Sequence, residues 1–336
     1  MRSTNTRRTL SCMQTTSKST TSATAVITMV LAATAGCSSG SNPSADTGAG
    51  PAAQAVFWDT LRSGHLAGMG AVHDQLVAAY GTEPNDPIAC RLIGMTLNAQ
   101  FAPTGQGDAG PPPGFAGGDA GVPPGLLEPL GYFKRAVDLD STNPQHYEFY
   151  ATGLYGEGEF GDNAAHDQAL QMWDQVVIPK LPGNGYSDRG TVLSIAPYQS
   201  SDFALALESF FRFYETCSGA VIDRTQPDLT PFVQAQAAGR FPSDICENTP
   251  HHVHTVEGLM FVFGDDLVKA QNISAAKAVY ATLATTRDFA EWPYKVQYEA
   301  RVSSDLNARA QLYTTGNPVT EPHLGTTPTC LGCHQE

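Results

Sequence analysis

Residues 132–154 read YFKRAVDLDSTNPQHYEFYATGL, and this stretch decides the fold. Apolar and aromatic residues recur at helical spacing on both sides of a short polar segment that ends in Asn143-Pro144. The pattern predicts one helix over residues 130–139 and a second over residues 145–154. We therefore expect two consecutive helices joined by a turn.

The same residues resemble the end of one tetratricopeptide repeat and the start of the next. The residues that carry the resemblance are Tyr132, Phe133, Ala136, Asp140, Asn143, Pro144, Tyr147, Tyr150, Ala151 and Leu154, then Gly158-Glu159-Phe160 at a turn. A small residue is followed by larger ones at the spacing of one helix face in two further places. These are Ala169, Trp173 and Val176, and Ala276, Tyr280 and Leu283.

The resemblance covers roughly half of the chain after residue 54. Ser141 stands where the repeat usually has proline, and insertions break the repeat period. The resemblance implies an array of helical hairpins, and such arrays generally bind proteins or peptides. An unrelated helical bundle is the alternative.

The remaining chain also reads as helical, and no alternating β pattern competes with this interpretation. The apolar spacing predicts further helices over residues 56–80, 87–101, 166–178, 202–217, 250–269, 274–285 and 289–313. The expected fold class is mainly α, a tetratricopeptide-like array of helical hairpins with a short C-terminal haem-binding tail.

Composition narrows the class of protein. Of 336 residues, 41% are hydrophobic, which is too apolar for a wholly disordered chain. The formal net charge is −14, which disfavours nucleic acid and anionic membrane surfaces as partners. The sequence contains no phosphate-binding loop, no Gly-x-Ser-x-Gly, no His-Glu-x-x-His and no dinucleotide fingerprint, so we expect no enzyme.

The N-terminus reads as an export signal. Basic residues precede an uncharged apolar run over residues 23–36, which is too short for a permanent membrane span. Ala35-Gly36-Cys37 resembles the bacterial lipobox, in which the cysteine becomes the lipidated first residue; Thr34 stands where that motif usually has leucine. The resemblance implies a protein tethered through Cys37 to a membrane of the bacterial cell envelope, facing the periplasm or the exterior. Ordinary signal cleavage with an unmodified Cys37 is the alternative, and Met13 is a possible start.

The predicted organisation has four parts. Residues 1–36 are the lipoprotein signal peptide, residues 37–54 a flexible tether rich in Ser, Gly, Ala and Pro, and residues 55–320 the helical domain. A disordered Gly/Pro-rich insertion is expected over residues 103–125 within that domain, and residues 321–336 form the tail.

The tail carries the motif with the clearest chemistry. Cys330-Leu331-Gly332-Cys333-His334 is Cys-x-x-Cys-His, the attachment motif of c-type cytochromes. Two thiols at this spacing meet the two vinyl groups of one haem edge, and the next imidazole falls under the iron. We expect one covalent haem c held by Cys330 and Cys333, with His334 as the proximal iron ligand.

Other interpretations of the tail remain. Cys330, Cys333 and His334 could bind zinc, with His323 as a fourth ligand, or the cysteine pair could form an inert or redox-active disulfide. The motif also stands unusually close to the last residue, so the haem pocket must come from the preceding helical body or from a partner protein.

The sixth iron position has three candidate ligands. Residues 248–254 read NTPHHVH, with Asn248 or Thr249 as a helix N-cap and Pro250 as a first helical residue. His254 lies off the apolar stripe of this helix, one turn before Gly258, and is our first candidate for the distal ligand. His251 comes next and His323 after it. Met260 belongs to the packing stripe, and three solvated histidines are the simpler interpretation.

The other cysteines, histidines and acidic pairs are interpreted as structural. Cys217 and Cys246 are the natural disulfide pair, and Cys90 is expected to be a buried thiol. His146 and His166 stand near helix starts as structural residues. The acidic pairs Asp265-Asp266 and Glu157-Gly158-Glu159 are expected to be solvated.

The sequence therefore predicts an exported, lipid-anchored, single-haem c-type cytochrome that transfers electrons to or from a redox partner protein. The alternative is a lipid-anchored scaffold that binds other envelope proteins, with the C-terminal cysteine pair structural, redox-active or zinc-binding. We expect contact with the membrane through the lipid anchor and no nucleic-acid partner.

Overall fold

The computed structural model describes residue 57 and residues 68–101, 124–159, 163–195, 200–240, 255–292 and 294–315. This part of the chain contains helices and turns and no strand, so the fold is mainly α. The helices are α3 (Met69–Tyr80), α4 (Pro87–Phe101), α5 (Pro124–Leu139), α6 (Pro144–Glu159), α7 (Asn163–Met172), α8 (Ile178–Lys180), α9 (Pro182–Ile195), α10 (Ser200–Ser218), α11 (Thr230–Ala237), α12 (Thr255–Lys269), α13 (Ile273–Leu283), α14 (Lys295–Ser303) and α15 (Leu306–Thr315).

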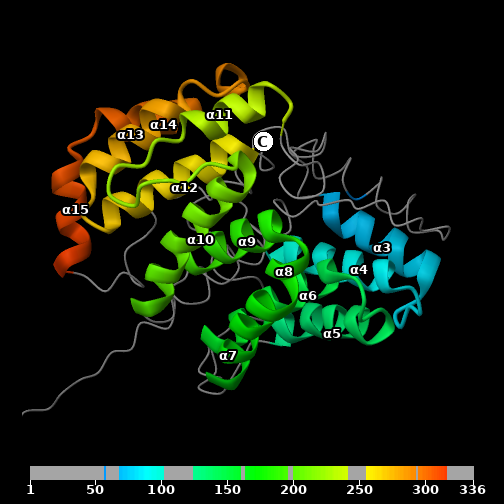
Figure 1. Ribbon diagram of the computed structural model, residues 1–336. Coiled ribbons are helices and arrows are strands. Elements are labelled where there is room, and N and C mark those ends of the chain that lie inside the picture. Colours follow the sequence, from blue (N-terminus) through cyan, green and yellow to red (C-terminus); the bar gives the residue numbers. More distant parts are fainter. Residues whose placement is uncertain are drawn as a thin grey trace, which may run out of the picture.

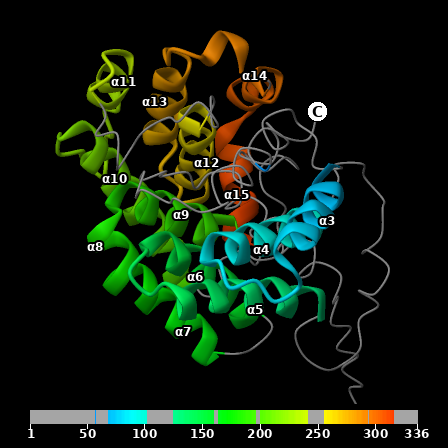
Figure 2. The same cartoon turned by 90° about the vertical axis from the view of Figure 1, so that its right-hand side faces the viewer.

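Helices that follow one another in sequence pack side by side. This holds for α3 through α7 in succession, for α9 with α10 and for α12 with α13. Helices α3–α8 form one group and α11–α15 another, and α9 and α10 lie between the two groups (Figures 1 and 2). The expected array of helical hairpins is confirmed.

Three apolar clusters hold these helices together. The first joins α3 to α6, the second joins α5, α6, α7, α9 and α10, and the third joins α10 to α15. The third cluster is rich in aromatic rings: Tyr214 packs edge-on against Phe232 at 4.8 Å between ring centroids, and Phe263 lies 5.3 Å from Tyr214. Rings at these separations contribute to stability beyond the area that they bury.

Helix α4 has the predicted bounds because its start is encoded locally. The Asp86 carboxylate accepts hydrogen bonds from the backbone N–H groups of Ile88 (2.8 Å) and Ala89 (2.9 Å), which the first helical turn leaves without partners. Pro87 is the first helical residue, where its lack of an N–H costs nothing. The cap at Asp86, the proline after it and the apolar stripe therefore indicate the same start for α4.

Other predicted bounds need correction. Helix α5 begins at Pro124, so residues 124–125 of the expected disordered insertion are helical. Helix α6 continues to Glu159, so Gly158 and Glu159 are helical rather than a turn. The helix predicted over residues 289–313 is a 3₁₀ turn, α14 and α15. It is interrupted before Asp305, whose carboxylate caps α15 by accepting from the N–H groups of Asn307 and Ala308.

One predicted packing position is shifted by a residue. Residues Trp173–Val177, after α7, form a π-helical turn, which is wider than an α-helical turn. Val177 is buried with Trp173 in the second apolar cluster, whereas Val176, the expected packing residue, is only half-buried. The expected burial of Ala169 and Trp173 is confirmed, as is that of Ala276, Tyr280 and Leu283.

The sequence pattern predicts neither α9 nor α11. Helix α9 has the sequence PGNGYSDRGTVLSI, which lacks an apolar stripe. Its polar residues are nevertheless buried, because α9 packs against α10, α12 and α6. Burial of polar side chains is favourable only when neighbouring helices supply partners, and no local sequence pattern reports such partners.

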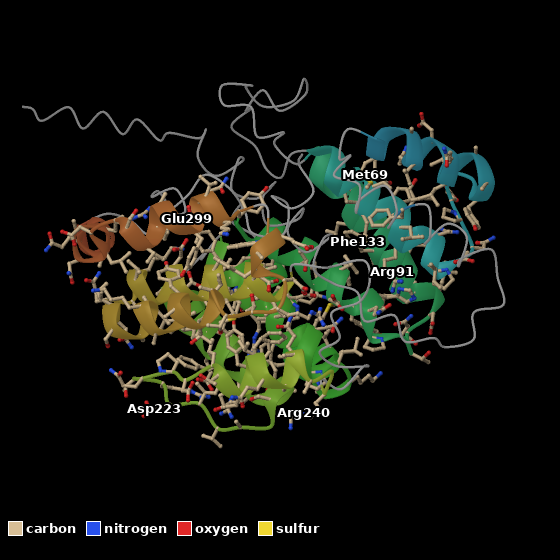
Figure 3. All side chains as sticks on the ribbon, turned by 90° about the horizontal axis from the view of Figure 1, so that it is seen from above. Met69, Arg91, Phe133, Asp223, Arg240 and Glu299 are labelled. Atoms are coloured by element: carbon tan, nitrogen blue, oxygen red, sulfur yellow. The ribbon has the colours of Figure 1, made fainter. Side chains whose placement is uncertain are left out.

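Close approach of α4 to α5 depends on a glycine. A Cβ atom on Gly94 would lie 2.6 Å from Cε1 of Phe133, a ring that is itself packed against Phe149 at 5.7 Å (Figure 3). We therefore expect Gly94→Ala to lower the free energy of unfolding by about 1–3 kcal/mol. Gly131→Ala on α5 is the matched control, since a Cβ there meets nothing within 4 Å. It should raise stability by up to ~1 kcal/mol. Urea titration of both variants measures the difference, and equal effects would refute the packing argument.

Candidate functional site

The residues of the predicted haem site lie outside the described part of the chain. Cys330, Cys333 and His334, together with His323, belong to residues 316–336, and His251 and His254 belong to residues 241–254. Cys37 also lies outside the described residues. These assignments therefore stay predictions, and the structure defines the helical body that precedes and surrounds them in sequence.

Helix α12, which follows the predicted distal histidines, is central to the C-terminal core. Every residue from Val256 to Val268 is buried, and Met260 is fully buried with Val256 and Phe263 in the third apolar cluster. The expected packing role of Met260 is confirmed. A helix with no exposed face over this length is held by neighbours on all sides.

The two described cysteines differ in chemistry. Cys217, near the end of α10, is disulfide-bonded, and its partner lies outside the described residues, so Cys246 stays the predicted partner. Cys90 is a buried free thiol, as expected, and its Sγ donates to the carbonyl oxygen of Pro84 at 3.4 Å. Burial raises the pKa of the Cys90 thiol to about 11, so it stays protonated and unreactive near neutral pH.

The expectation that Asp265 and Asp266 are solvated is wrong. Both lie on α12 and are buried, because this helix is covered on all sides. Arg301 of α14 places Nη2 3.2 Å from Oδ2 of Asp265, and the Tyr280 hydroxyl donates to Oδ1 of the same carboxylate. Burial raises the pKa of Asp265 while Arg301 and Tyr280 lower it. The pair is thus an internal ion pair between α12 and α14.

Asp266 has a separate counterion. Nζ of Lys269, one turn further along α12, lies 3.3 Å from Oδ1 of Asp266, and both side chains are buried. Lys269 also donates to the carbonyl oxygen of Ser194 at the end of α9 and lies over the Phe203 ring of α10. Burial raises the pKa of Asp266 to about 6 despite the lysine. This lysine therefore connects three helices.

His146 and His166 are buried near helix starts, as expected of structural residues. Nε2 of His166 on α7 lies 3.2 Å from Oδ2 of Asp202 on α10, and the Tyr155 hydroxyl of α6 donates to the same oxygen at 3.0 Å. The Tyr155 and His166 rings pack at 5.4 Å between centroids. The Asp202 carboxylate thus joins α6, α7 and α10, and its contacts with Tyr155 and His166 hold these helices together.

His146 on α6 has an environment that disfavours its charged form. Its side chain is fully buried, Arg91 of α4 is nearby, and Asp140 is 3.9 Å away (Figure 3). Burial, then Arg91, lowers the pKa of His146 to about 3, and Asp140 opposes them. The folded protein therefore holds a neutral imidazole over a pH range in which the unfolded chain holds a proton.

This shift predicts acid destabilisation. Because the folded-state pKa of His146 is below the unfolded value near 6.5, the unfolded chain binds more protons between these values. The contribution of His146 to stability is complete above about pH 6.5 and is lost by up to ~1.4 kcal/mol per pH unit as the pH falls towards its folded pKa. Urea titrations of the wild type and His146→Gln should give parallel pH profiles above pH 7 and diverging ones below. Parallel profiles over the whole range would contradict this assignment.

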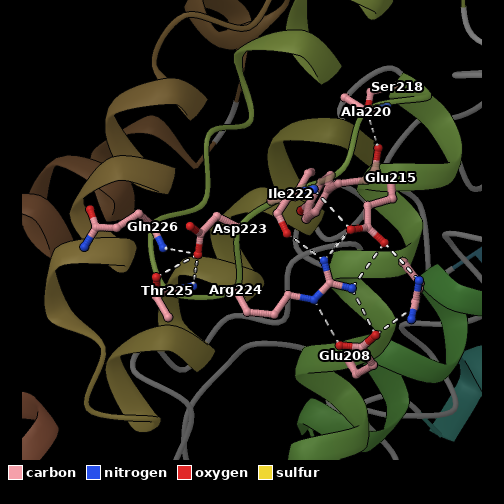
Figure 4. Close-up of polar contacts among 11 residues, drawn as sticks. Glu208, Glu215, Ser218, Ala220, Ile222, Asp223, Arg224, Thr225 and Gln226 are labelled. Carbon is pink, nitrogen blue, oxygen red and sulfur yellow. Dashed lines mark hydrogen bonds and ion pairs between the residues drawn. The ribbon is translucent and has the colours of Figure 1, made fainter.

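A network of ion pairs fastens the segment after α10 to that helix (Figure 4). Nη2 of Arg224 lies 3.0 Å from Oε1 of Glu208 and 3.1 Å from Oε2 of Glu215, and Nη1 also pairs with Glu215. The guanidinium lies 4.7 Å from the centroid of the Phe211 ring. The hydrogen bond from Arg224 is the main cause of the lowered pKa of Glu215. The network holds the segment directly after the disulfide-bonded Cys217.

No cluster of three or more His, Cys, Asp or Glu side chains suited to a metal ion occurs among the described residues. Within the same part of the chain, no helix is both long enough and apolar enough to span a membrane.

Comparison with known proteins identified no relative. No protein-family model, no curated protein and no solved structure matches this chain.

Several buried acidic residues have no signal in the sequence. The sequence indicates no role for Asp188 on α9 or Glu148 on α6, and it indicates Asp202 only as the start of a helix, yet all three are buried. Asp188 follows a Gly-rich segment without an apolar stripe, and its position between helices emerges only from the packing of α9. No spacing rule connects residues on helices that are not neighbours in the chain.

Proposed function

We propose that this protein is an exported, lipid-anchored, single-haem c-type cytochrome that works in electron transfer. The observation that carries the proposal is Cys330-Leu331-Gly332-Cys333-His334, in a chain whose residues 2–36 have the pattern of an export signal. The haem would supply one-electron transfer. Cys330 and Cys333 would hold it through thioether bonds, and His334 would bind its iron.

The disulfide at Cys217 supports this proposal. Structural disulfides persist in oxidising compartments outside the cytoplasm, which is where haem is attached covalently to Cys-x-x-Cys-His. A lipid on Cys37 would keep the protein at a membrane, and residues 37–54 would be the tether between the anchor and the helical body.

The helical body or a redox partner protein would supply the other contacts of the haem. His254 is our first candidate for the distal iron ligand, followed by His251 and His323. His254 directly precedes α12, whose described residues are buried in the C-terminal core.

The alternative function is a lipid-anchored scaffold that binds other envelope proteins. The array of helical hairpins favours it, since tetratricopeptide-like arrays generally bind proteins or peptides. In that case the C-terminal cysteine pair would be a disulfide, a redox pair or part of a zinc site.

Removal of residues 329–336 tests whether the tail carries the haem and whether the helical body folds without it. We expect the truncated protein to be folded, helical and colourless, because the described core ends before this polar segment. Far-ultraviolet circular dichroism and the visible absorption spectrum of the exported protein are the measurements. The full-length protein should have the same helical signal and a haem spectrum.

Two outcomes would count against the proposal. If the full-length protein is as colourless as the truncated one in cells that attach haem to other cytochromes, the scaffold function is favoured. If truncation removes the helical signal, the tail is part of the folded core and is not an appended redox group.

A further inference from the structure

Helix α14 lies at the outside of the C-terminal group of helices and exposes apolar side chains (Figure 1). The described chain has four exposed large apolar residues, and two of them, Val296 and Val302, belong to this nine-residue helix, with 72% and 46% exposure. Glu299, Ala300 and Ser303 are exposed beside them (Figure 3). These five residues are called the α14 face. Exposed apolar residues that stand singly need no explanation, whereas two on one short helix form a shared apolar surface.

The inner side of α14 is fixed to the core, so the α14 face has a defined position. The Tyr298 hydroxyl donates to the carbonyl oxygen of Tyr280 on α13 at 2.9 Å, and the Tyr298 ring packs edge-on against Phe289 at 5.0 Å between centroids. Nη2 of Arg301 lies 3.2 Å from Oδ2 of Asp265 on α12. A surface that is already ordered loses little conformational freedom when another segment binds to it.

The size of the α14 face favours an occupant from the same chain. A helix of nine residues is about 14 Å long. A stable interface between separate proteins buries about 800 Å² on each partner, which one helix face of this length does not provide. A segment tethered to the same chain binds at a high effective concentration, so a small face is sufficient for it.

The tail, residues 316–336, begins directly after α15, the helix that follows α14. Helix α15 is fixed in turn, because Nε2 of Gln271 donates to the carbonyl oxygen of Ala310 at 2.6 Å. Cys330 stands 15 residues beyond Thr315, and a chain of that length reaches up to about 50 Å. Helices α14 and α15 together are about 29 Å long, so the α14 face is within reach of the motif.

Charge also favours the tail as the occupant. Residues 255–315 contain seven acidic and six basic residues, a formal net charge of −1, whereas the whole chain carries −14. The tail contains two acidic residues, Glu321 and Glu336, and no Lys or Arg. The helices α12 to α15 therefore repel this acidic tail less than the rest of the acidic chain does.

The start of α12 lies beside the segment that leads into α14. Glu257, in the first turn of α12, interacts with Thr286, and the Phe261 ring packs edge-on against Trp292 at 5.4 Å between centroids. His254, the first candidate for the distal iron ligand, directly precedes α12 in the sequence. A tail that docks on α14 therefore binds to the same part of the body as the start of α12.

We propose that the α14 face is the docking site of the haem-bearing tail, with Val296 and Val302 covering apolar parts of the tail and its haem. This inference rests on the proposed function, and it names the part of the body that supplies the haem contacts. Removal of apolar surface from water drives the docking.

The test places a photo-crosslinking residue on the α14 face of the full-length exported protein. Val296→p-benzoylphenylalanine is irradiated, and mass spectrometry identifies the crosslinked peptides. We expect crosslinks to residues 316–336 of the same chain. Adding Val302→Asp should lower their yield, because a charge replaces an apolar contact. Leu139→p-benzoylphenylalanine is the matched control, since Leu139 is 41% exposed at the end of α5, in the other group of helices, and it should give no crosslink to the tail.

Docking and haem attachment are measured separately on the same sample. A haem stain after denaturation reports the proposed function, and the crosslinks report the docking. Haem without crosslinks from position 296 to the tail overturns the docking site and leaves the proposed function standing. Crosslinks to the tail in a protein without haem support the docking site and overturn the proposed function. Crosslinks to a second copy of the chain, or equal yields from positions 139 and 296, also overturn the docking site.

Discussion

Replacing Arg301 with methionine is expected to lower the free energy of unfolding by about 3–5 kcal/mol at neutral pH. Arg301 is buried, and its guanidinium both pairs with Asp265 and lies 5.0 Å from the centroid of the Phe261 ring. Methionine fills a similar volume but removes the cation with the largest influence on the Asp265 carboxylate, which is buried in a fully covered helix. An uncompensated buried charge is among the most costly single changes that a protein interior can undergo.

The loss of stability caused by Arg301→Met should depend on pH. Burial raises the pKa of Asp265 and Arg301 lowers it, so removal of Arg301 leaves the effect of burial less opposed. The folded variant would take up a proton at Asp265, and the penalty should shrink as the pH falls towards about 4, where the unfolded chain is protonated as well. Urea titrations between pH 4 and pH 8 measure this dependence.

Two further variants make this prediction specific to burial. The double variant Arg301→Met with Asp265→Asn should recover much of the loss, because Tyr280 can still donate to the Asn oxygen and no charge remains. Arg212→Met removes an exposed ion pair with Glu208 and should cost only about 0.2–1 kcal/mol. A cost below 1 kcal/mol for Arg301→Met alone would show that Asp265 is not held by this pair.

Replacing both Cys330 and Cys333 with alanine is expected to remove all covalently bound haem. Each thioether bond requires one of these thiols, and the described part of the chain has a single free cysteine, Cys90, which is buried with a raised pKa. We expect the helical body to keep its fold, since the three apolar clusters are formed by described residues that precede the tail. The measurement is the haem content after denaturation, relative to protein mass. Cys90→Ala is the control, and it should retain the full haem content. Haem that survives denaturation in the double variant would place the attachment elsewhere.

Sequence reasoning succeeded where the signal is local. The cap at Asp86, the proline after it and the apolar stripe of α4 lie within a few residues of one another, so the predicted bounds match the structure. The same holds for the packing residues Ala276, Tyr280 and Leu283, whose spacing follows directly from one α-helix.

Sequence reasoning failed where tertiary partners determine the outcome. Asp265 and Asp266 read as a solvated pair, because Arg301 and Tyr280, the partners of Asp265, lie on other helices. No local pattern shows that Asp266 and its neighbour Lys269 are buried together. The sequence does not predict α9, because Arg189 finds its partners on other elements, namely Asp174 in the π-helical turn and Ser209 of α10. The wider π-helical turn also moved the packing position from Val176 to Val177, which no propensity rule reports.

The motif of the tail is also a local signal. The spacing of Cys330, Cys333 and His334 predicts haem attachment, and these residues lie outside the described part of the chain. The assignment of His254 as distal ligand likewise stays a prediction from the sequence.

The most direct test of the central claim is a haem measurement on the denatured wild-type protein. The exported protein is produced in cells that carry the haem-attachment machinery, separated on a denaturing gel, and stained for haem peroxidase activity, and its intact mass is recorded. Thioether bonds survive denaturation, so we expect a stained band and a mass that is larger than that of the polypeptide by one haem. An unstained band at the mass of the polypeptide alone would contradict the account and would favour the envelope scaffold.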